Sequence, residues 1–409
     1  MNDNIKVPEG WKRVRLGEIL KYEQPTKYLV KNENYDKNSG IPVLTPGKTF
    51  ILGYTDEKFG IFENLPVIIF DDFTTESKYI NFPFKLKSSA IKILNTKNEE
   101  NNLYVAYCIL QILNFKPGSE HKRFWISEFS KFQISLPPLP EQQKIAEIFE
   151  TVDNAIEKTE KIIEKYKRIK QGLMQDLLTK GIDENGKIRS EKTHKFKDSP
   201  IGRIPEEWEV VRLGEVCNVK RGASPRPIDD PIYFTQKGIG RAWIRIEDIK
   251  GKYLLETNQY LSKIGEEKSV KVEPNEVIMS ICATIGRPTI VKIHSCIHDG
   301  FVALKDLSNR IISEFLYYLL ELKETEINSL GQIGTQGNLN TTIVKKIQIP
   351  LPPLLEQQRI AEILSQIDNT IEKEEAYKQK LERIKKGLME DLLTGKVRVN
   401  KLIEEEDKK

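Results

Sequence analysis

Two stretches of the chain place apolar residues about 3.5 positions apart and fill the positions between them with charged residues. Such a step is typical of a helix that buries one narrow seam against another helix. The first stretch, Glu141 to Thr179, has 39 residues, which predicts a helix roughly 58 Å long. The seam positions are Ile145, Phe149, Val152, Ile156, Ile163, Tyr166, Leu173 and Leu177, and then Ile360, Leu364, Ile367, Ile371, Leu381, Leu388 and Leu392. A helix this long and this polar outside its seam needs a partner, and the natural partner is the other copy.

Local signals mark the ends of these helices. Prolines up to Pro140 disfavour helix before residue 141, because a residue that precedes proline is pushed out of the helical region. Gly181 and Gly395 stand just past the last seam residues, where a helix stop is expected. Gly172 and Gly387 lie at matching interior positions, where each costs about 1 kcal/mol relative to alanine. They indicate either a close helix approach or a contact surface for another protein.

An internal duplication organises the whole chain. Residues Ile134–Ile148 recur as Ile349–Ile363 at an offset of 215, and 29 of the 47 positions from 134 to 180 are identical to their partners. A second shared block, residues 8–19, recurs as residues 205–216 at an offset of 197. The difference, 215 − 197 = 18, means that the second half carries 18 extra residues between its two blocks. The chain is therefore a frame, a variable insert and a frame, repeated twice.

The inserts, about 20–135 and 217–350, have a different texture from the frame. They mix β-rich runs such as 67–70 and 276–282 with turn clusters, and each contains one amphipathic helix, at about 103–114 and 312–322. This pattern predicts an α+β fold with two mixed α/β globules and two long helices. Residues 181–200 are polar and unpatterned, and they are interpreted as the linker between the halves.

Composition excludes several classes of protein. Lys and Arg number 64 against 60 Asp and Glu, so a basic coat over the whole surface is excluded, although local basic patches are not. The four cysteines lack C-x-x-C spacing, which indicates reduced, buried thiols. The longest apolar run, 65–70, is too short to span a membrane, and residues 1–6 do not resemble a secretion signal. We therefore expect a cytoplasmic protein without membrane contact.

The motifs that suggest catalysis or metal binding lack the context they need. Residues 181–187 have P-loop spacing but follow a helix, so a turn is expected there. Asp72 (or its neighbour Asp71), Glu76 and Lys78 could imitate the magnesium-binding set of a nuclease, and this remains the alternative function. His294, Cys296 and His298 could surround zinc on one strand face, but partly satisfied histidines at the edge of a core strand are expected instead. We expect no metal site and no cofactor of its own.

Basic and polar residues recur near glycine and serine in both inserts, a composition that suits phosphate contact and guanine readout. The loop 331–340 adds glutamine and asparagine, whose side chains read adenine edges. The candidate DNA-binding residues are Thr74, Thr75, Lys78, Tyr79, His121, Lys122, Arg123, Lys220, Arg221, Arg226, Arg241, Arg245, Arg287, Gln336 and Asn338.

The repeated motif Leu-Pro-Pro-Leu-x-Glu-Gln-x-x-Ile-Ala-x-Ile and the helix end Arg-Ile-Lys-x-Gly-Leu-Met-x-Asp-Leu-Leu-Thr resemble the specificity subunit of type I restriction–modification systems. The opening Pro-Glu-x-Trp-x-x-x-Arg-Leu-Gly-Glu of each half is similar too, so the resemblance covers essentially the whole chain. The first insert departs from the family pattern: it has residues 118–125 where the second has 334–340. Contact residues are therefore assigned to each half separately.

The resemblance implies a protein without catalytic activity that reads an asymmetric, bipartite site on double-stranded DNA. Two modification (methyltransferase) subunits would dock on an antiparallel pair of long helices, and restriction (translocase-nuclease) subunits would join them. S-adenosylmethionine would then belong to the modification subunit, and ATP and magnesium to the restriction subunit. A coiled-coil scaffold without nucleic acid is a further alternative.

The expected domain boundaries follow from the repeat together with this resemblance. They are a first target-recognition domain (1–140), a first spacer helix (141–180), a linker (181–200), a second target-recognition domain (201–355), a second spacer helix (356–396) and a polar tail (397–409).

Overall fold

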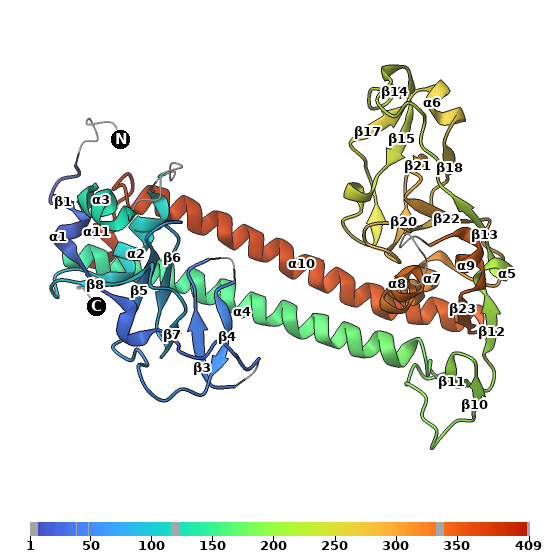
Figure 1. Cartoon of the computed structure of the whole chain (residues 1–409), viewed down its shortest axis with the longest axis horizontal. Coiled ribbons are helices and arrows are strands. Elements are labelled where there is room, and N and C mark those ends of the chain that lie inside the picture. Colours follow the sequence, from blue (N-terminus) through green and yellow to red (C-terminus); the bar gives the residue numbers. More distant parts are fainter. Residues whose placement is uncertain are drawn as a thin grey trace. The chain divides into compact units, whose positions relative to one another are not determined.

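The computed structural model describes residues 7–37, 39–47, 49–113, 115, 123–332 and 339–406. The chain divides into two compact units, Met1–Lys161 with Glu375–Lys409, and Ile162–Glu374. Each unit contains one globule together with a part of each long helix (Figure 1).

The two long helices are α4 (Leu139–Leu177) and α10 (Leu354–Leu392), each 39 residues long. Helix α4 begins two residues before the expected position because Pro140 occupies its first turn, where the missing N–H of proline has no helical partner to lose. Gly181 and Gly395 follow the helix ends with φ of +66° and +72°, the left-handed conformation of a C-terminal stop. Every predicted seam residue is buried or half-buried, which confirms the 3.5-residue pattern.

The helices run antiparallel, as expected. In the first unit, Lys385 Nζ lies 2.6 Å from Asp153 Oδ1, and Lys378 Nζ lies 2.6 Å from Glu160 Oε1. Moving forward along α4 therefore means moving backward along α10. In the second unit, Lys170 Nζ lies 2.8 Å from Asp368 Oδ1.

The interior glycines do not serve a close helix approach within the described residues. A Cβ built on Gly172 or on Gly387 would have no described atom within 4 Å. The expectation of a close approach was wrong for this part of the chain, because both residues face open space. The other expectation, a contact surface for a second protein, stays a prediction.

The first unit contains an antiparallel four-stranded sheet in the order β2-β8-β5-β6 and a three-stranded sheet in the order β4-β3-β7. A separate pair, β1 with β9, joins the two frame blocks. The strands are β1 (Lys12–Arg15), β2 (Leu20–Glu23), β3 (Ile41–Leu44), β4 (Ile51–Thr55), β5 (Val67–Asp71), β6 (Ser77–Ile80), β7 (Lys85–Leu86), β8 (Ile91–Thr96) and β9 (Gln133–Leu136). The helices are α1 (Leu16–Ile19), α2 (Leu103–Ile112), α3 (Phe124–Ser127) and α11 (Asn400–Glu406).

The four-stranded sheet of the first unit has a different core on each face. Ile68 and Phe70 of β5 pack with α2 and with α4, whereas Val67 and Ile69 pack toward the three-stranded sheet. This alternation is the period of two that a strand imposes on its side chains. Helix α2 confirms the amphipathic helix expected at about 103–114.

The second unit has two five-stranded sheets, in the orders β13-β22-β19-β20-β16 and β14-β17-β15-β21-β18. The pair β12 with β23 repeats the frame pairing of the first unit. The strands of the first sheet are β13 (Asn218–Arg221), β16 (Tyr253–Leu254), β19 (Val277–Ser280), β20 (Pro288–Val291) and β22 (Phe301–Lys305). Those of the second sheet are β14 (Phe234–Thr235), β15 (Arg241–Ile244), β17 (Gln259–Leu261), β18 (Val270–Val272) and β21 (Ser295–Ile297), and the frame strands are β12 (Glu209–Arg212) and β23 (Gln348–Leu351). The helices are α5 (Leu213–Val216), α6 (Lys263–Glu267), α7 (Ser313–Leu322), α8 (Glu324–Gln332) and α9 (Thr341–Lys346).

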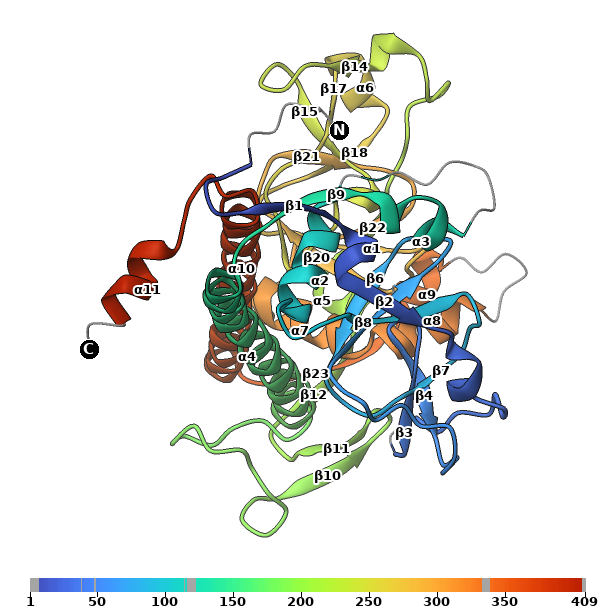
Figure 2. The same ribbon diagram turned by 90° about the vertical axis from the view of Figure 1, so that its left-hand side faces the viewer.

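The segment 181–200 is more ordered than the interpretation as a linker implied. It contains the strand β10 (Phe196–Ser199), which forms a hairpin with β11 (Gly202–Pro205) (Figure 2). Arg189 in this segment is 8% exposed and forms an ion pair with Glu356 at the start of α10. The polar composition of residues 181–200 therefore reflects a buried ion pair and a surface hairpin. Residues 181–188 form the expected turn, closed by a bridge between Ile182 and Ile188.

The structure confirms the expectation of buried, free thiols for three of the four cysteines. Cys108, Cys217 and Cys296 are buried, Cys282 is half-buried, and all four are free. Among the described residues, no helix is both long and apolar enough to cross a membrane.

Candidate nucleic-acid interface

Two predicted DNA-binding residues of the second unit, together with Ser224, gather around Asp299, in the turn between β21 and β22. Arg221 donates from Nε to the Asp299 backbone carbonyl (3.3 Å), and Arg226 donates from Nη2 to Oδ2 (2.9 Å). Ser224 donates from Oγ to Oδ1 (3.0 Å). The side chain of Arg226 nevertheless remains 66% exposed. Asp299 thus orients two guanidinium groups without removing them from solvent.

The charge of Asp299 is maintained at neutral pH. Burial acts to raise its pKa, but the hydroxyl of Ser224 and the charges of His298 and Arg226 outweigh burial, so the pKa lies below its ordinary value. The neighbouring His298 has a lowered pKa because burial disfavours its charged form, although Asp299 acts in the other direction. Asp299 is therefore ionised at neutral pH, where it can hold the guanidinium of Arg226.

Arg245 lies beside an aromatic platform in the same unit. Its guanidinium carbon is 5.8 Å from the ring centroid of Trp243, whose ring is 5.7 Å from that of His298. The side chain of Arg245 is 40% exposed, so it can still contact a phosphate or a base. Trp243 itself is buried and belongs to the core of the second sheet.

The other basic candidates of the second unit occupy different settings. Lys220 on β13 and Arg287 in the turn after β19 are exposed. Arg241 is only 16% exposed and lies 3.6 Å from Glu266, with a second ion pair to Glu273. Its guanidinium therefore ties β15 to the segments around α6 and β18, a structural role that the sequence did not indicate.

In the first unit, the turn between β5 and β6 lies beside the start of α3. Phe124 N donates to the Asp72 carbonyl (2.9 Å), and Trp125 N donates to Asp72 Oδ1 (2.8 Å). These bonds place Arg123, which precedes Phe124, beside the turn that contains Thr74 and Thr75, two and three residues after Asp72. Two segments far apart in the sequence, which together carry three candidates, are therefore joined by hydrogen bonds.

Lys78 and Tyr79, which are adjacent in sequence, lie on opposite faces of β6. Tyr79 is opposite Ile68, on the face that packs against α2, and its ring centroid is 5.0 Å from that of Tyr104. Lys78 is opposite Ile69, on the other face. A single DNA contact patch cannot contain both side chains on this strand. The remaining candidates His121, Lys122, Gln336 and Asn338 lie outside the described residues.

The nuclease alternative fails on burial. Asp72 is fully buried, and its Oδ2 lies 3.4 Å from the ammonium of the equally buried Lys92. Glu76 is exposed in the turn beyond. A carboxylate sealed beside an internal lysine cannot share a magnesium ion with a solvent-exposed glutamate. The zinc arrangement fails similarly, because Cys296 is buried on a strand paired on both sides, and the described residues contain no cluster of potential metal ligands.

A contact that the sequence reasoning missed joins each globule to the long helices. In the first unit, the hydroxyl of Tyr104 on α2 donates to Asp153 of α4, which also binds Lys385 of α10. In the second unit, Tyr318 of α7 donates to Asp368 of α10 (2.6 Å), which also binds Lys170 of α4 (2.8 Å). The duplication relates the aspartate and the lysine of the two sets, because Asp153 and Lys170 recur at +215 as Asp368 and Lys385. This constant offset is the sequence signal from which the two ion pairs could have been predicted.

The repeated Glu-Gln pair at the start of each long helix also has a structural role. Gln142 Oε1 accepts from Asn102 N (2.8 Å), and Gln357 Oε1 accepts from Ile312 N (3.1 Å). Asn102 and Ile312 are the N-cap residues of α2 and α7. The frame motif therefore fixes the helix of each globule against the long helix that follows it.

Comparisons with known proteins agree with this duplicated architecture. A family model described as the type I restriction modification DNA specificity domain matches residues 8–168 and again 205–383. A type I restriction enzyme specificity subunit of Escherichia coli is 33% identical over 370 residues, covering 86% of this chain and 85% of that protein. The MjaVIII specificity subunit of Methanocaldococcus jannaschii is 32% identical over 422 residues, covering 97% and 95%.

Solved structures show the same fold. The crystal structure of a type I restriction–modification S subunit from M. genitalium has a TM-score of 0.62 at 16% identity, covering 96% of this chain and 97% of that one. A chain from a study of complex assembly and conformational transition of the type I system has a TM-score of 0.54 at 19% identity, covering 96% and 100%. The fold and the repeat define a class of protein with two unlike globules on a duplicated helical frame. This chain belongs to the family of type I restriction–modification specificity subunits.

Proposed function

We propose that this chain is the DNA-recognition subunit of a cytoplasmic type I restriction–modification complex, without catalytic activity of its own. Each globule reads one half of an asymmetric, bipartite site on double-stranded DNA. The long helices carry two modification subunits, and restriction subunits join that assembly. S-adenosylmethionine is used by the modification subunit, and ATP and magnesium by the restriction subunit.

The observation that carries this proposal is the combination of one duplicated frame with two unlike globules. The frame pairs β1–β9 and β12–β23 are equivalent, whereas a four-stranded sheet in the first unit corresponds to a five-stranded sheet in the second. Unlike globules suit unlike half-sites, and exposed arginines such as Arg221 and Arg226 suit phosphate and guanine contacts.

A domain exchange tests the proposal. Residues 217–348 are replaced by the corresponding insert of another specificity subunit, and the hybrid is expressed with the modification subunit. Modified-base sequencing of the host genome should show a bipartite motif in which one half-site has changed and the other has not. A motif that is unchanged, or that changes in both halves, would contradict the assignment of one half-site to each globule.

A further inference from the structure

The second unit contains a lysine in an aromatic cage built on the Tyr318–Asp368 contact. Lys252 Nζ donates to Tyr318 Oη (3.0 Å) and to Ser365 Oγ of α10 (2.7 Å). Its ammonium lies 4.4, 4.9 and 5.8 Å from the ring centroids of Tyr318, Tyr253 and Tyr317. Lys252 is 7% exposed, so cation–π contacts and hydrogen bonds replace its hydration.

Strand β16 positions this lysine. Lys252 immediately precedes β16, the edge strand that pairs in parallel with β20. The carbonyl of Lys252 accepts from Ile290 N (2.8 Å), and the carbonyl of Leu254 accepts from Lys292 N (2.9 Å). The cage is therefore filled by a short extended segment that adds to the sheet and places one cation against the long helix.

The registers show where the equivalent position lies in the first unit. Ile290 is opposite Val277, which is opposite Leu304. Tyr79 is opposite Ile68, which is opposite Leu94. Strand β6 thus corresponds to β20, but the sheet of the first unit ends there, and no described strand corresponds to β16.

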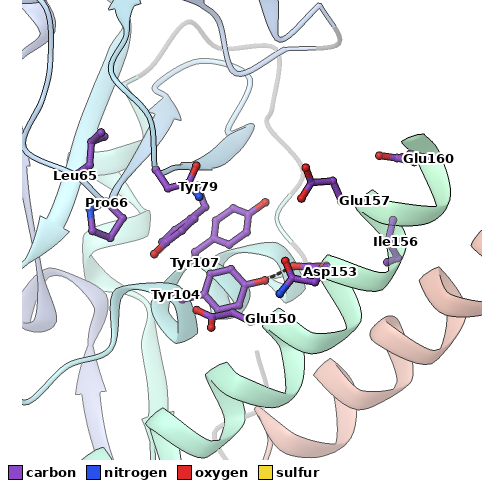
Figure 3. Close-up of a pocket in the computed structure, with 12 residues that line it drawn as sticks. Leu65, Pro66, Tyr79, Tyr104, Tyr107, Glu150, Asp153, Ile156, Glu157 and Glu160 are labelled. Carbon is purple, nitrogen blue, oxygen red and sulfur yellow. Dashed lines mark hydrogen bonds between the residues drawn. The ribbon is translucent and has the colours of Figure 1, made fainter. Parts of the chain in front are cut away.

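A cavity of about 700 Å³ opens at this position between β6, α2 and α4 (Figure 3). It contains Tyr104, which contacts Asp153, together with two more aromatic rings and further carboxylates. The aromatic and acidic lining residues include Tyr79, Tyr104, Tyr107, Glu150, Asp153 and Glu157. The rings of Tyr79 and Tyr107 lie 5.9 Å apart, and Tyr104 is within 6.0 Å of both. The position of Ser365 in the second unit is held by Glu150 here, since 365 − 215 = 150.

The electrostatic field in this cavity favours a positively charged group. Burial raises the pKa of Tyr79, and the charge of Glu150 raises it further. Lysines do approach the carboxylates from the helix side: Lys385 binds Asp153, Lys161 binds Glu157, and Lys378 binds Glu160. In contrast to the second unit, none of the described lysines or arginines lines the cavity itself.

We propose that this cavity receives a lysine or arginine side chain from an extended segment of the modification subunit, which adds to the edge of β6 as β16 adds to β20. The proposal rests on the proposed function, because it assumes that the chain assembles with that subunit. Main-chain hydrogen bonds to β6 would supply affinity, and the tyrosine–carboxylate cage would select the cation. The two units would then engage their partners differently, since the second unit fills its own cage.

The first test measures assembly of the full-length chain with its purified modification subunit. The double variant Glu150→Gln/Glu157→Gln removes two charges from the cavity at exposed positions of α4. We expect the Kd for the modification subunit to rise roughly tenfold, and Glu150→Lys to weaken binding further by repulsion. The matched control is Glu372→Gln, which lies at the repeat position of Glu157 (157 + 215 = 372) in the unit where Lys252 already occupies the cage. Its Kd should stay within about twofold of the wild type.

The second test measures backbone hydrogen exchange of β6. Binding of the modification subunit should slow exchange of the amides of residues 77–81, and the double variant should lose this protection. Suppose that the wild type assembles, but the variants leave its Kd unchanged and binding does not slow exchange of residues 77–81. The cavity proposal is then overturned and the proposed function stands. If the wild type does not assemble with its modification subunit, both fail. If spermidine binds the isolated chain at this cavity while assembly leaves β6 unprotected, the site takes a small cation and the strand-addition proposal is wrong.

Discussion

The guanidinium of Arg189 and the carboxylate of Glu356 form a buried, two-pronged ion pair in the second unit, with Nη2 3.2 Å from Oε2 and Nη1 bonded to Oε1. Trp208 Nε1 donates to the same carboxylate (3.1 Å), as does Ile182 N (2.9 Å). The pair ties the segment that follows α4 to the start of α10.

The first unit repeats this arrangement with the chain order exchanged. Glu141 at the start of α4 binds Arg398, which follows α10, and accepts a hydrogen bond from Trp11 Nε1 (3.2 Å). The duplication therefore interlocks: the segment leaving each long helix binds the glutamate that begins the other. The same buried glutamate–arginine–tryptophan contact thus recurs in each unit.

Glu356→Gln should lower the free energy of unfolding by about 3 kcal/mol, because it leaves the buried charge of Arg189 without its buried partner and with only the half-exposed Glu207 beside it. The control is Glu207→Gln, whose carboxylate also contacts Arg189 (2.9 Å) but is 49% exposed. That change should cost less than about 1 kcal/mol. Urea unfolding of both variants measures the difference, and equal losses would show that the buried pair contributes no more than a surface pair.

Arg221→Ala should weaken DNA binding by the assembled methyltransferase. The loss should be about 1–3 kcal/mol if Arg221 reads a base, or the salt slope should fall by about one unit if it holds a phosphate. Arg241→Ala should also weaken DNA binding, and it should lower the melting temperature as well, since Arg241 is paired with Glu266 and Glu273. Binding titrations at several salt concentrations test this. If neither substitution alters affinity or its salt dependence, the assigned DNA face of the second unit is wrong.

Iodoacetamide should modify Cys282 well before the other cysteines in the native protein. Burial raises the pKa of Cys108 and of Cys217 to about 12 and that of Cys296 to about 11, so at pH 8 these thiols are both protonated and inaccessible. Cys282 is half-buried, and its pKa is also raised by burial, so its alkylation should accelerate as the pH rises and thiolate forms. Peptide mass spectrometry after timed labelling gives the order, and equal rates for all four would contradict the burial.

Four residues inserted into α4 between Asp153 and Lys165 should shift the preferred gap between half-sites by one or two base pairs. The insertion adds about one turn, or 6 Å, and half-sites on one DNA face favour centres about 34–36 Å apart. The half-sites themselves should not change. Modified-base sequencing reports both properties. A variant that folds, assembles and keeps the original gap would show that the helices dock partners without setting the spacing.

The purified chain should neither methylate nor cleave DNA in the presence of S-adenosylmethionine, ATP and magnesium. Asp72→Asn should destabilise the fold by about 3 kcal/mol, because it leaves Lys92 buried without its carboxylate. Glu76→Ala, at an exposed position, should leave stability unchanged. Cleavage by the wild type that Glu76→Ala abolishes would restore the nuclease alternative.

The sequence by itself determined the features that depend on local spacing. The 3.5-residue seam, the stops at Gly181 and Gly395, the helices near 103 and 312 and the duplication all follow from residues close together in the chain or at one constant offset. Helix periodicity and left-handed stops are local properties of the backbone, so they can be predicted without knowing the fold. The motifs that resemble specificity subunits belong to the same repeated frame.

Only the tertiary structure decided which polar residues are buried and which are free to bind. Asp72 is sealed against Lys92, Arg241 is paired across strands, and Arg189 is buried against Glu356, although all three are polar residues of unremarkable spacing. Their roles depend on partners 20 to 167 positions away, and no periodicity records such a distance. The cage around Lys252 and the open edge of β6 are of the same kind, because a strand gained in one half and not in the other becomes visible only when both sheets have been assembled.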